Sequence, residues 1–322
     1  MKKILVITGI TASGKTSLAV KIAKRIKADL ISADSRQIYK EMDIGTGKDI
    51  GKSGFKSVMK IGRLDIGYHV ICGIRIWLLD VVEPNFKFSV TEYRKAFDQV
   101  CTLIEKRNRK VIVVGGSGFY VESILNPSEN FNKTPKKIIR WVLNKFETSV
   151  IVAIYKLIRP KDFEKLNNSE KNNRHRLIRK IELCLSTKKK TEWVDKKYEG
   201  KVIWLTAKNE FIKKRINKRA EDRIKNGLLE EVKGLVDKYG WSAFGLNCLA
   251  YKEFFDYFGN RKSLGECISK WKTDEYAYAK RQKTWFKKRN YKMIEIDRVV
   301  IDDTIEGIVD GTIFYEQEGH EN

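Results

Sequence analysis

Apolar positions in the first 125 residues follow two alternating periods. Residues 3–8 form a β-branched run typical of a buried strand, and after a Gly-containing turn the apolar residues between Leu18 and Ile26 recur at helical spacing. The same alternation then predicts buried strands at residues 30–32, 76–82 and 111–114 and a helix that begins at the capping box Ser89–Glu92. Strands that alternate with helices predict a parallel sheet with right-handed crossovers.

Beyond residue 125 the pattern becomes mainly helical. Residues 126–172 are polar and basic, which predicts a helical insertion, and within it residues 148–157 fit a strand by their β-branched content and a helix by their position. The later predicted elements are a helix at 174–186, a strand at 202–205, helices at 211–225, 228–239 and 252–258, and a long helix from the capping box Ser263–Glu266 to about residue 289. We therefore expect an α/β core over 1–125, the insertion over 126–172, the remainder of the core with further helices over 173–290, and a strand and tail over 291–322.

Composition narrows the class of protein. Of the 322 residues, 42% are hydrophobic, enough for one large core or two ordinary ones. No apolar run reaches the roughly 18 residues that a membrane helix needs, and the apolar start breaks off too early for a signal sequence, so we expect a soluble, cytoplasmic protein, monomeric by default. The 65 Lys and Arg against 41 Asp and Glu give a net charge of +24, which fits a polyanionic partner or a solvated basic surface equally well.

The segment Gly9–Thr16 matches G-x-x-x-x-G-K-[ST] and lies between a predicted strand and a predicted helix, as a phosphate-binding P-loop requires. Its backbone N–H groups can surround phosphate oxygens, Lys15 supplies a cation, and the Thr16 hydroxyl can bind Mg²⁺. The expected diphosphate-binding residues are Gly9, Thr11, Ala12, Ser13, Gly14, Lys15 and Thr16. Kinases, NTPases and other users of diphosphates share this motif. Asp80 fits a metal-orienting aspartate of such a site and, equally, a simple acid at a strand end.

Further motifs, taken with the P-loop, closely resemble the tRNA dimethylallyltransferase family. They are Thr11–Thr16, Asp34-Ser35-x-Gln37-x-Tyr39, Met42–Thr46, Gly115–Tyr120, Arg176–Glu182, Arg215-x-x-x-Arg219, Gly227–Val232, Tyr251-Lys252-Glu253 and Ala279–Trp285. The resemblance spans about residues 3 to 290 and implies a P-loop NTPase-like α/β fold.

The resemblance also implies a reaction. The donor would be dimethylallyl diphosphate, whose diphosphate leaves as N6 of adenosine 37, next to the anticodon, attacks the allylic carbon. The P-loop amides, Lys15, Arg219 and a Mg²⁺ ion on Thr16 would stabilise the leaving group. Asp34 would accept the proton of N6. Read from the sequence alone, Asp34 fits an Asx-type turn at a strand end better.

The target adenine is stacked in the anticodon loop, so the enzyme would have to extract it. The residues expected to contact the tRNA anticodon stem-loop are Asp34, Ser35, Arg36, Gln37, Ser117, His175, Arg176, Leu177, Ile178, Arg179, Asn247, Tyr251 and Lys252, with Lys280 and Arg281 from a cationic run near the end. In the insertion, Lys133, Lys136, Lys137 and Arg140 would hold the anticodon stem or form a solvated helix face.

Some positions depart from the family pattern. Ala250 stands where glycine is usual before Tyr251, Tyr276 stands where arginine is usual, and residues 49–75 are enlarged and irregular. Three alternatives therefore remain open: an isopentenyltransferase acting on free adenylate, an ATP-binding P-loop kinase of a small molecule, and an RNA-binding protein with a vestigial donor site.

Overall fold

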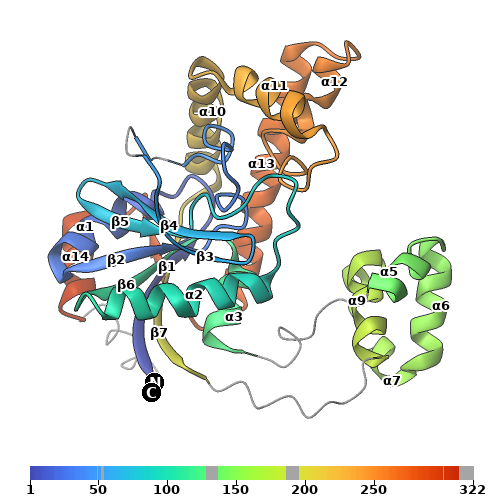
Figure 1. Cartoon of the computed structure of the whole chain (residues 1–322), viewed down its shortest axis with the longest axis horizontal. Coiled ribbons are helices and arrows are strands. Elements are labelled where there is room, and N and C mark those ends of the chain that lie inside the picture. The colour runs from blue at the N-terminus through green and yellow to red at the C-terminus, as the bar shows by residue number, and fades with distance from the viewer. Residues whose placement is uncertain (49, 52–53, 128–136, 186–195, 300, 312–322) are drawn as a thin grey trace. The chain divides into compact units, whose positions relative to one another are not determined.

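A mixed sheet forms the centre of the larger of two compact units in the computed structural model, which describes residues 1–48, 50–51, 54–127, 137–185, 196–299 and 301–311. Its strand order is β3-β4-β5-β2-β6-β1-β7-β8 (Figure 1). The strands are β1 (Lys2–Gly9), β2 (Ala28–Ser32), β3 (Lys56–Ile61), β4 (Leu64–Ile71), β5 (Ile74–Trp77), β6 (Lys110–Gly115), β7 (Tyr198–Thr206) and β8 (Lys292–Glu295). From β5 to β8 all neighbours are parallel, which confirms the predicted α/β class.

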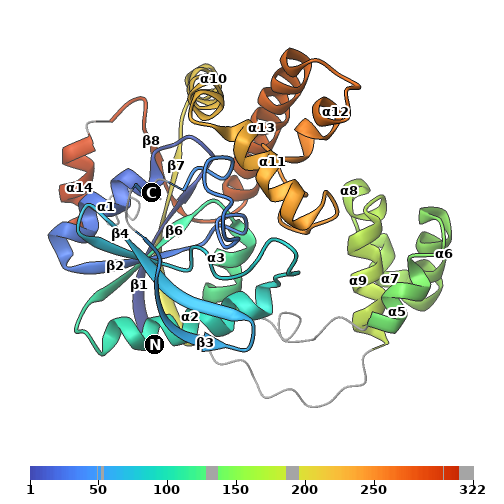
Figure 2. The same cartoon turned by 45° about the horizontal axis from the view of Figure 1, so that its top comes forward.

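Helices cover both faces of this sheet (Figure 2). Those of the larger unit are α1 (Lys15–Ile26), α2 (Val90–Glu105), α3 (Gly118–Leu125), α10 (Asn209–Lys225), α11 (Leu228–Tyr239), the 3-10 turn η1 (Lys252–Phe254), α12 (Phe255–Phe258), α13 (Leu264–Lys287) and α14 (Ile301–Val309). Successive residues of β1 point to opposite faces, as strand geometry requires. Val6 joins the cluster that contains Phe97 of α2, whereas Ile7 joins the cluster of Leu18 from α1 and Ile305 from α14.

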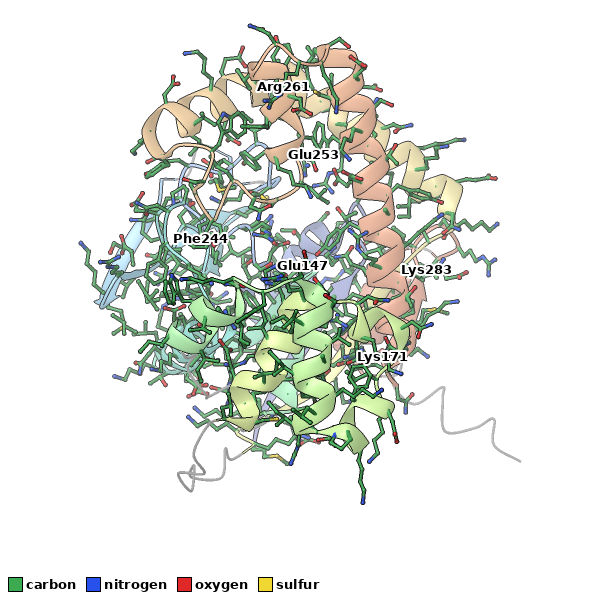
Figure 3. The ribbon with its side chains drawn as sticks, turned by 90° about the vertical axis from the view of Figure 1, so that its right-hand side faces the viewer. Glu147, Lys171, Phe244, Glu253, Arg261 and Lys283 are labelled. Carbon is green, nitrogen blue, oxygen red and sulfur yellow. The ribbon has the colours of Figure 1, made fainter. Side chains whose placement is uncertain are left out.

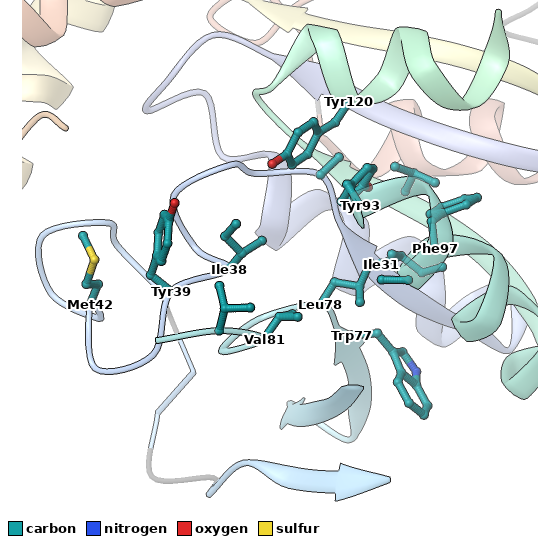
Figure 4. Close-up of a cluster of buried hydrophobic side chains, with 14 of the residues drawn as sticks. Ile31, Ile38, Tyr39, Met42, Trp77, Leu78, Val81, Tyr93, Phe97 and Tyr120 are labelled. Carbon is teal, nitrogen blue, oxygen red and sulfur yellow. The ribbon is translucent and has the colours of Figure 1, made fainter. Parts of the chain in front are cut away.

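Aromatic packing secures the end of β2, from which the site loops continue. Tyr93 and Tyr120 stack with ring centroids 4.0 Å apart, and Phe97 lies next along α2 (Figure 4). The Tyr93 hydroxyl donates to the Ser32 carbonyl oxygen at 3.1 Å. All three rings are almost completely buried, so the last residue of β2 is held from the α2 side of the sheet.

The edge of the sheet differs from the expectation. Strands β3 and β4 form an antiparallel hairpin within the stretch that the sequence pattern treats as irregular. Most of β3 is exposed, so it lacks the apolar signal of a buried strand. Strand β5 ends at Trp77 rather than near Val82, because Leu78 and Asp80 have φ angles of 61° and 56°, outside the range of an extended strand. After the expected terminal strand β8, helix α14 forms where a tail was expected.

In the second unit, Asn126–Asp195, the described residues are mainly helical, as predicted. Its helices are α5 (Lys137–Leu143), α6 (Thr148–Ile158), α7 (Pro160–Glu164), α8 (Asn168–Lys171) and α9 (Arg174–Cys184), so the ambiguous residues 148–157 are helical. Helix α9 lies in this unit and not in the core, since its Leu177 and Ile181 pack on Ile151 and Tyr155 of α6. The predicted boundary at residue 172 therefore differs from the observed one.

The chain leaves the core for this unit after Leu125 and returns at Lys196. On the core, Leu125 packs directly on β7, where a Cβ placed on Gly200 would lie 2.4 Å from Leu125 Cδ2. Among the described helices, none is long and apolar enough to cross a membrane.

A buried ionic network braces the loop that follows β2. The Lys48 side chain is 0% exposed and donates to the Tyr39 carbonyl at 2.6 Å, to Asp43 Oδ1 at 2.8 Å and to Asp80 Oδ1. The second oxygen of Asp80 lies 2.7 Å from His69 Nε2. Burial opposes ionisation of Asp80, but the His69 hydrogen bond and the Lys48 charge outweigh it and hold the pKa of Asp80 below its usual value. Asp80 is thus a partner of Lys48 and His69, which explains it without a metal.

We expect Asp80→Ala to lower the free energy of unfolding by about 3 kcal/mol, because it leaves the buried Lys48 ammonium with one carboxylate fewer. Since the pKa of Asp80 is lowered, this stabilisation should be complete above the ordinary aspartate pKa of 3.8 and should vanish as the pH falls through the lowered value. Urea denaturation as a function of pH measures both effects. Asp237→Ala, which removes only an exposed pair with Lys233, serves as the control, and equal midpoints for the two variants would contradict the expectation.

Candidate functional site

A cavity of about 740 Å³ opens where the parallel strands β1, β2 and β6 end. Ligands of open α/β sheets bind at this carboxyl edge. The lining consists of Thr11–Ser17, Ser32, Asp34–Gln37, Gly45–Gly47, Ile76, Val114–Gly116 and Asn247–Leu249, together with Arg215, Arg219, Arg223, Lys252, Glu275, Tyr278, Arg281 and Gln282. The P-loop and the segment after β2, predicted separately from the sequence, therefore face one space.

The P-loop depends on two glycines. Gly9 has a φ of 142°, and a Cβ there would lie 2.2 Å from the Leu205 carbonyl oxygen of β7. Gly14, with a φ of 80°, precedes the first residue of α1. Both angles lie where glycine alone is free of strain, so the loop can turn its amides toward the cavity. The Lys15 ammonium closes the loop by donating to the Ile10 carbonyl at 2.7 Å.

Lys15 is a partly buried cation of the cavity. Burial, the largest effect, lowers the pKa of Lys15 to about 8; the Asp34 charge opposes this shift, and Arg219 and Arg215 add to it. A bound anion would remove this penalty, because opposite charge favours the protonated form.

Helix α13 braces the P-loop from 271 residues away in the sequence. Gln282 Oε1 accepts the Thr11 N–H at 2.8 Å, and Gln282 Nε2 donates to the Gly116 carbonyl at 2.9 Å. Glu275 Oε1 accepts the Thr11 hydroxyl at 3.3 Å. Sequence reasoning included Gln282 in a motif without assigning it a role, because nothing local to α13 indicates so distant a partner.

The position of Asp34 is compatible with both interpretations of the sequence, an Asx turn and a proton acceptor. Its Oδ1 accepts the Arg36 N–H at 2.9 Å, which is an Asx turn. Its Oδ2 takes part in no hydrogen bond with the described residues, and the residue lines the cavity. The neighbouring turn is held by Ser117, whose Oγ accepts the Ser35 N–H at 2.9 Å. The Asx turn therefore orients a carboxylate that keeps one oxygen available.

Glu231 of α11 holds the loop after the Asp34 segment. Its carboxylate accepts the N–H groups of residues 43, 44 and 45 at 2.7 to 3.0 Å and the Tyr251 hydroxyl at 2.6 Å. Gln37 Nε2 donates to the carbonyls of Thr46 and Gly47 on the same loop. The motifs around residues 42–46 and 227–232 are thus one structural unit.

Cations dominate the lining: Lys15, Arg36, Arg215, Arg219, Arg223, Lys252 and Arg281 face the acids Asp34 and Glu275. Arg223 lies 3.8 Å from Glu275, and Arg219 and Arg223 both pack against Gly47. This excess of positive charge suits a ligand with several negative charges.

Most of the predicted site residues of the core reach the cavity. Those that line it are Thr11, Ala12, Ser13, Gly14, Lys15, Thr16, Asp34, Ser35, Arg36, Gln37, Arg219, Asn247, Lys252 and Arg281. Gly9, Ser117 and Lys280 lie outside the lining. Tyr251, predicted as a tRNA contact, is 0% exposed and bonded to Glu231, so the structure assigns its side chain to the scaffold.

Some of the predicted tRNA contacts in α9 are exposed, and others are buried. His175 and Arg176 are exposed, and Arg179 Nη1 lies 3.3 Å from Glu182. Leu177 and Ile178 are at most 1% exposed and pack in the core of the second unit, which corrects their prediction as tRNA contacts.

Arg140 forms an ion pair within the second unit, because its guanidinium donates to both oxygens of the buried Glu182 at 2.8 Å. Lys133 and Lys136 lie outside the described residues, and Lys137 begins α5.

The described residues contain no group of three or more His, Cys, Asp or Glu that could hold a metal on its own. Thr16 nevertheless offers an oxygen ligand to the cavity. This ligand fits Mg²⁺, which takes few protein ligands and completes its coordination with phosphate oxygens and water.

Known proteins are similar to this chain both in sequence and in fold. The profile of the IPP transferase family matches residues 37–289, and that of isopentenyl transferases matches residues 2–61. A tRNA dimethylallyltransferase of Clostridioides difficile is 34% identical over 308 residues, which cover 92% of this chain and 94% of the relative. The chain belongs to the IPP transferase family. Another tRNA dimethylallyltransferase, from Caldanaerobacter subterraneus, is 35% identical to this family member over 88% of the chain and 89% of the relative.

Solved structures support the fold of this IPP transferase. The full-length tRNA isopentenylpyrophosphate transferase of Bacillus halodurans matches 99% of both chains with a TM-score of 0.68 and 26% identity. A eukaryotic dimethylallyltransferase acting on tRNA matches 97% of this chain and 80% of its own with a TM-score of 0.75; at 21% identity this likeness concerns the fold alone.

Binding of inorganic diphosphate to this IPP transferase should take up protons at pH 8 and above, because the anion raises a Lys15 pKa that starts at about 8. Calorimetry in two buffers of different ionisation enthalpy measures the uptake, and the difference between wild type and Lys15→Met isolates this residue. The affinity of the wild type should also fall above pH 8. Identical proton uptake by the two proteins would contradict the assignment.

Gln282→Ala should weaken diphosphate binding by about tenfold, since the loop loses a hydrogen bond that fixes the Thr11 amide. Gln99→Ala changes the same side chain at an exposed position of α2 and should bind like wild type. Calorimetry measures both affinities, and thermal unfolding shows whether each variant is folded. A wild-type affinity in folded Gln282→Ala would refute the bracing role.

Proposed function

We propose that this chain transfers a dimethylallyl group from dimethylallyl diphosphate to N6 of adenosine 37, beside the anticodon of tRNAs, with release of diphosphate. One observation carries the proposal: a single cavity contains both a P-loop and a carboxylate oxygen, Asp34 Oδ2, that forms no hydrogen bond with the described residues. The names of the relatives, tRNA dimethylallyltransferases, agree with this chemistry.

The donor half of the cavity binds the leaving group. The bond between the allylic carbon and the diphosphate oxygen breaks, and the electron pair leaves with the diphosphate. The P-loop, Lys15 and Arg219 line the cavity, and in this proposal the loop amides and the two cations stabilise the anion that forms. Thr16 would hold a Mg²⁺ ion, which would supply further neutralisation of the diphosphate. Lys15 leaves the Ile10 carbonyl to meet the anion, so the resting loop already holds its main cation nearby.

The acceptor half handles the adenine. N6 is a weak nucleophile, because its lone pair is delocalised into the ring. As the new carbon–nitrogen bond forms, the N6 proton passes to Asp34 Oδ2, while the Arg36 N–H holds Oδ1 in place. The base reaches this carboxylate only when it is turned out of the anticodon loop.

Cations around the mouth and on the second unit bind the rest of the tRNA in this proposal. Arg36, Lys252 and Arg281 line the cavity, and His175 and Arg176 are exposed on α9. Phosphates attract such groups without regard to sequence, and the net charge of +24 strengthens the attraction.

Asp34→Asn should reduce kcat for transfer of label from dimethylallyl diphosphate to an anticodon stem-loop with adenosines at 36 and 37 by at least about 100-fold, because the amide accepts no proton. Diphosphate affinity should stay within about twofold, since the Asx turn keeps an acceptor oxygen.

The matched control is Asp302→Asn, the same change at an exposed position of α14, and a stem-loop with guanosine at 37 should take no label. Unlabelled RNA with the wild-type enzyme, or transfer of γ-phosphate from ATP to a small molecule instead, would reject the proposed function. Full activity of Asp34→Asn would reject only the role of Asp34.

A further inference from the structure

The cavity wall formed by residues 247–252, here called the wall segment, contains a strained residue. Ala250 has a φ of 72°, in the left-handed region that residues with a Cβ avoid. Ala250 is 1% exposed and packs in the hydrophobic core, whereas Asn247, Cys248, Leu249 and Lys252 line the cavity. The strain therefore lies at the point where the segment turns between the core and the cavity.

One carboxylate holds this strained residue. Glu253 Oε2 accepts the Ala250 N–H at 3.0 Å. Glu253 is 5% exposed and packs beside α13 (Figure 3), and burial raises its pKa to about 7. Its other oxygen, Oε1, has no hydrogen-bond partner among the described residues, and Lys252 Nζ lies 3.8 Å from it.

A carboxyl group buried with one oxygen unbonded destabilises a fold. The hydrogen bond between Glu253 and Ala250 thus joins a carboxyl group that is costly to bury to a residue with a strained backbone. Such unfavourable conformations are typical of segments that serve function.

The wall segment lies on the acceptor side of the cavity. The Cys248 thiol is close enough to Arg36 and Asp34 for their charges to affect its pKa, although burial is the main cause of its rise to about 12. Tyr251 connects the segment to Glu231 and so to the loop at 43–45. The P-loop, by contrast, is braced by Gln282 and Glu275 of α13.

We propose that Glu253 is a positioning residue for the RNA acceptor: its hydrogen bond to Ala250 holds the wall segment in the conformation that presents Asn247 and Lys252 to the cavity. This inference rests on the proposed function, because it assigns the segment to the RNA. Without the bond, Ala250 relaxes toward negative φ and the lining residues on either side move. The diphosphate half of the cavity stays in place, since its contacts are separate.

The two residues allow a test by rescue. Glu253→Ala should raise the KM for the anticodon stem-loop about tenfold, the effect of one lost hydrogen bond, with the KM for dimethylallyl diphosphate within about twofold of wild type. Glu253→Gln keeps an acceptor oxygen and should stay near wild type. Adding Ala250→Gly to Glu253→Ala should restore most of the affinity for RNA, because glycine adopts the left-handed conformation without strain.

A matched control lies at the start of α13. Glu266 Oε2 accepts the N–H of Ser263, also three residues earlier, at 2.8 Å and outside the cavity lining. Glu266→Ala should lower the thermal midpoint and leave both KM values unchanged. If Glu253→Ala behaves in the same way, or if Ala250→Gly fails to rescue it, the proposal is overturned.

Two further measurements keep the outcomes distinct. Glu253→Asp retains the charge but is one methylene too short to reach Ala250, so it should reproduce the RNA defect even if Glu253→Ala does not fold; a wild-type KM would overturn the proposal.

If the wild-type enzyme transfers no prenyl group, the proposed function fails. Fluorescence anisotropy of stem-loop binding then tests Glu253 alone, with the same order of affinities expected and equal affinities overturning the role.

Discussion

Repulsion among cations that share one cavity is the constraint to which the surrounding structure responds. Seven cationic side chains (Lys15, Arg36, Arg215, Arg219, Arg223, Lys252 and Arg281) and only two acids line the space. The pKa of Lys15 is lowered mainly by burial, and the charges of Arg219 and Arg215 add to that shift. In the resting protein its ammonium bonds to a loop carbonyl, and Arg223 lies near Glu275. A ligand with several negative charges would relieve this repulsion, because opposite charge favours the protonated form of each cation.

Helices position the loops of the cavity through single side chains that bond to backbone groups. Gln282 of α13 holds the P-loop, Glu231 of α11 holds the loop at 43–45, and Glu253 of η1 holds the wall segment. Among the described residues, each partner is a backbone N–H with no other acceptor, and such groups are costly to leave unpaired when buried. Each of these loops is therefore tied to a helix.

Local signals allowed much of this fold to be predicted. The P-loop lies between β1 and α1 as its motif requires, and the capping boxes at Ser89 and Ser263 mark the starts of α2 and α13. The hairpin β3–β4 was not predicted, because an exposed edge strand lacks a buried apolar pattern.

For the site, motifs identified which residues matter but not their partners, since the bonds of Gln282 and Glu231 join distant parts of the chain. For Leu177, the family motif was misleading. The apolar positions of its helix indicate packing in a core, as the structure shows, whereas the motif suggested a contact with tRNA.

The contact between Leu125 and Gly200 has a consequence for how such a protein varies. The chain departs from and rejoins the core at one place, so the whole helical unit is, for the sheet, a single long loop between α3 and β7. The entropy of closing a loop grows only slowly with its length. The helical unit can therefore be lengthened, shortened or exchanged with little effect on the stability of the sheet, so the two units can vary independently of each other.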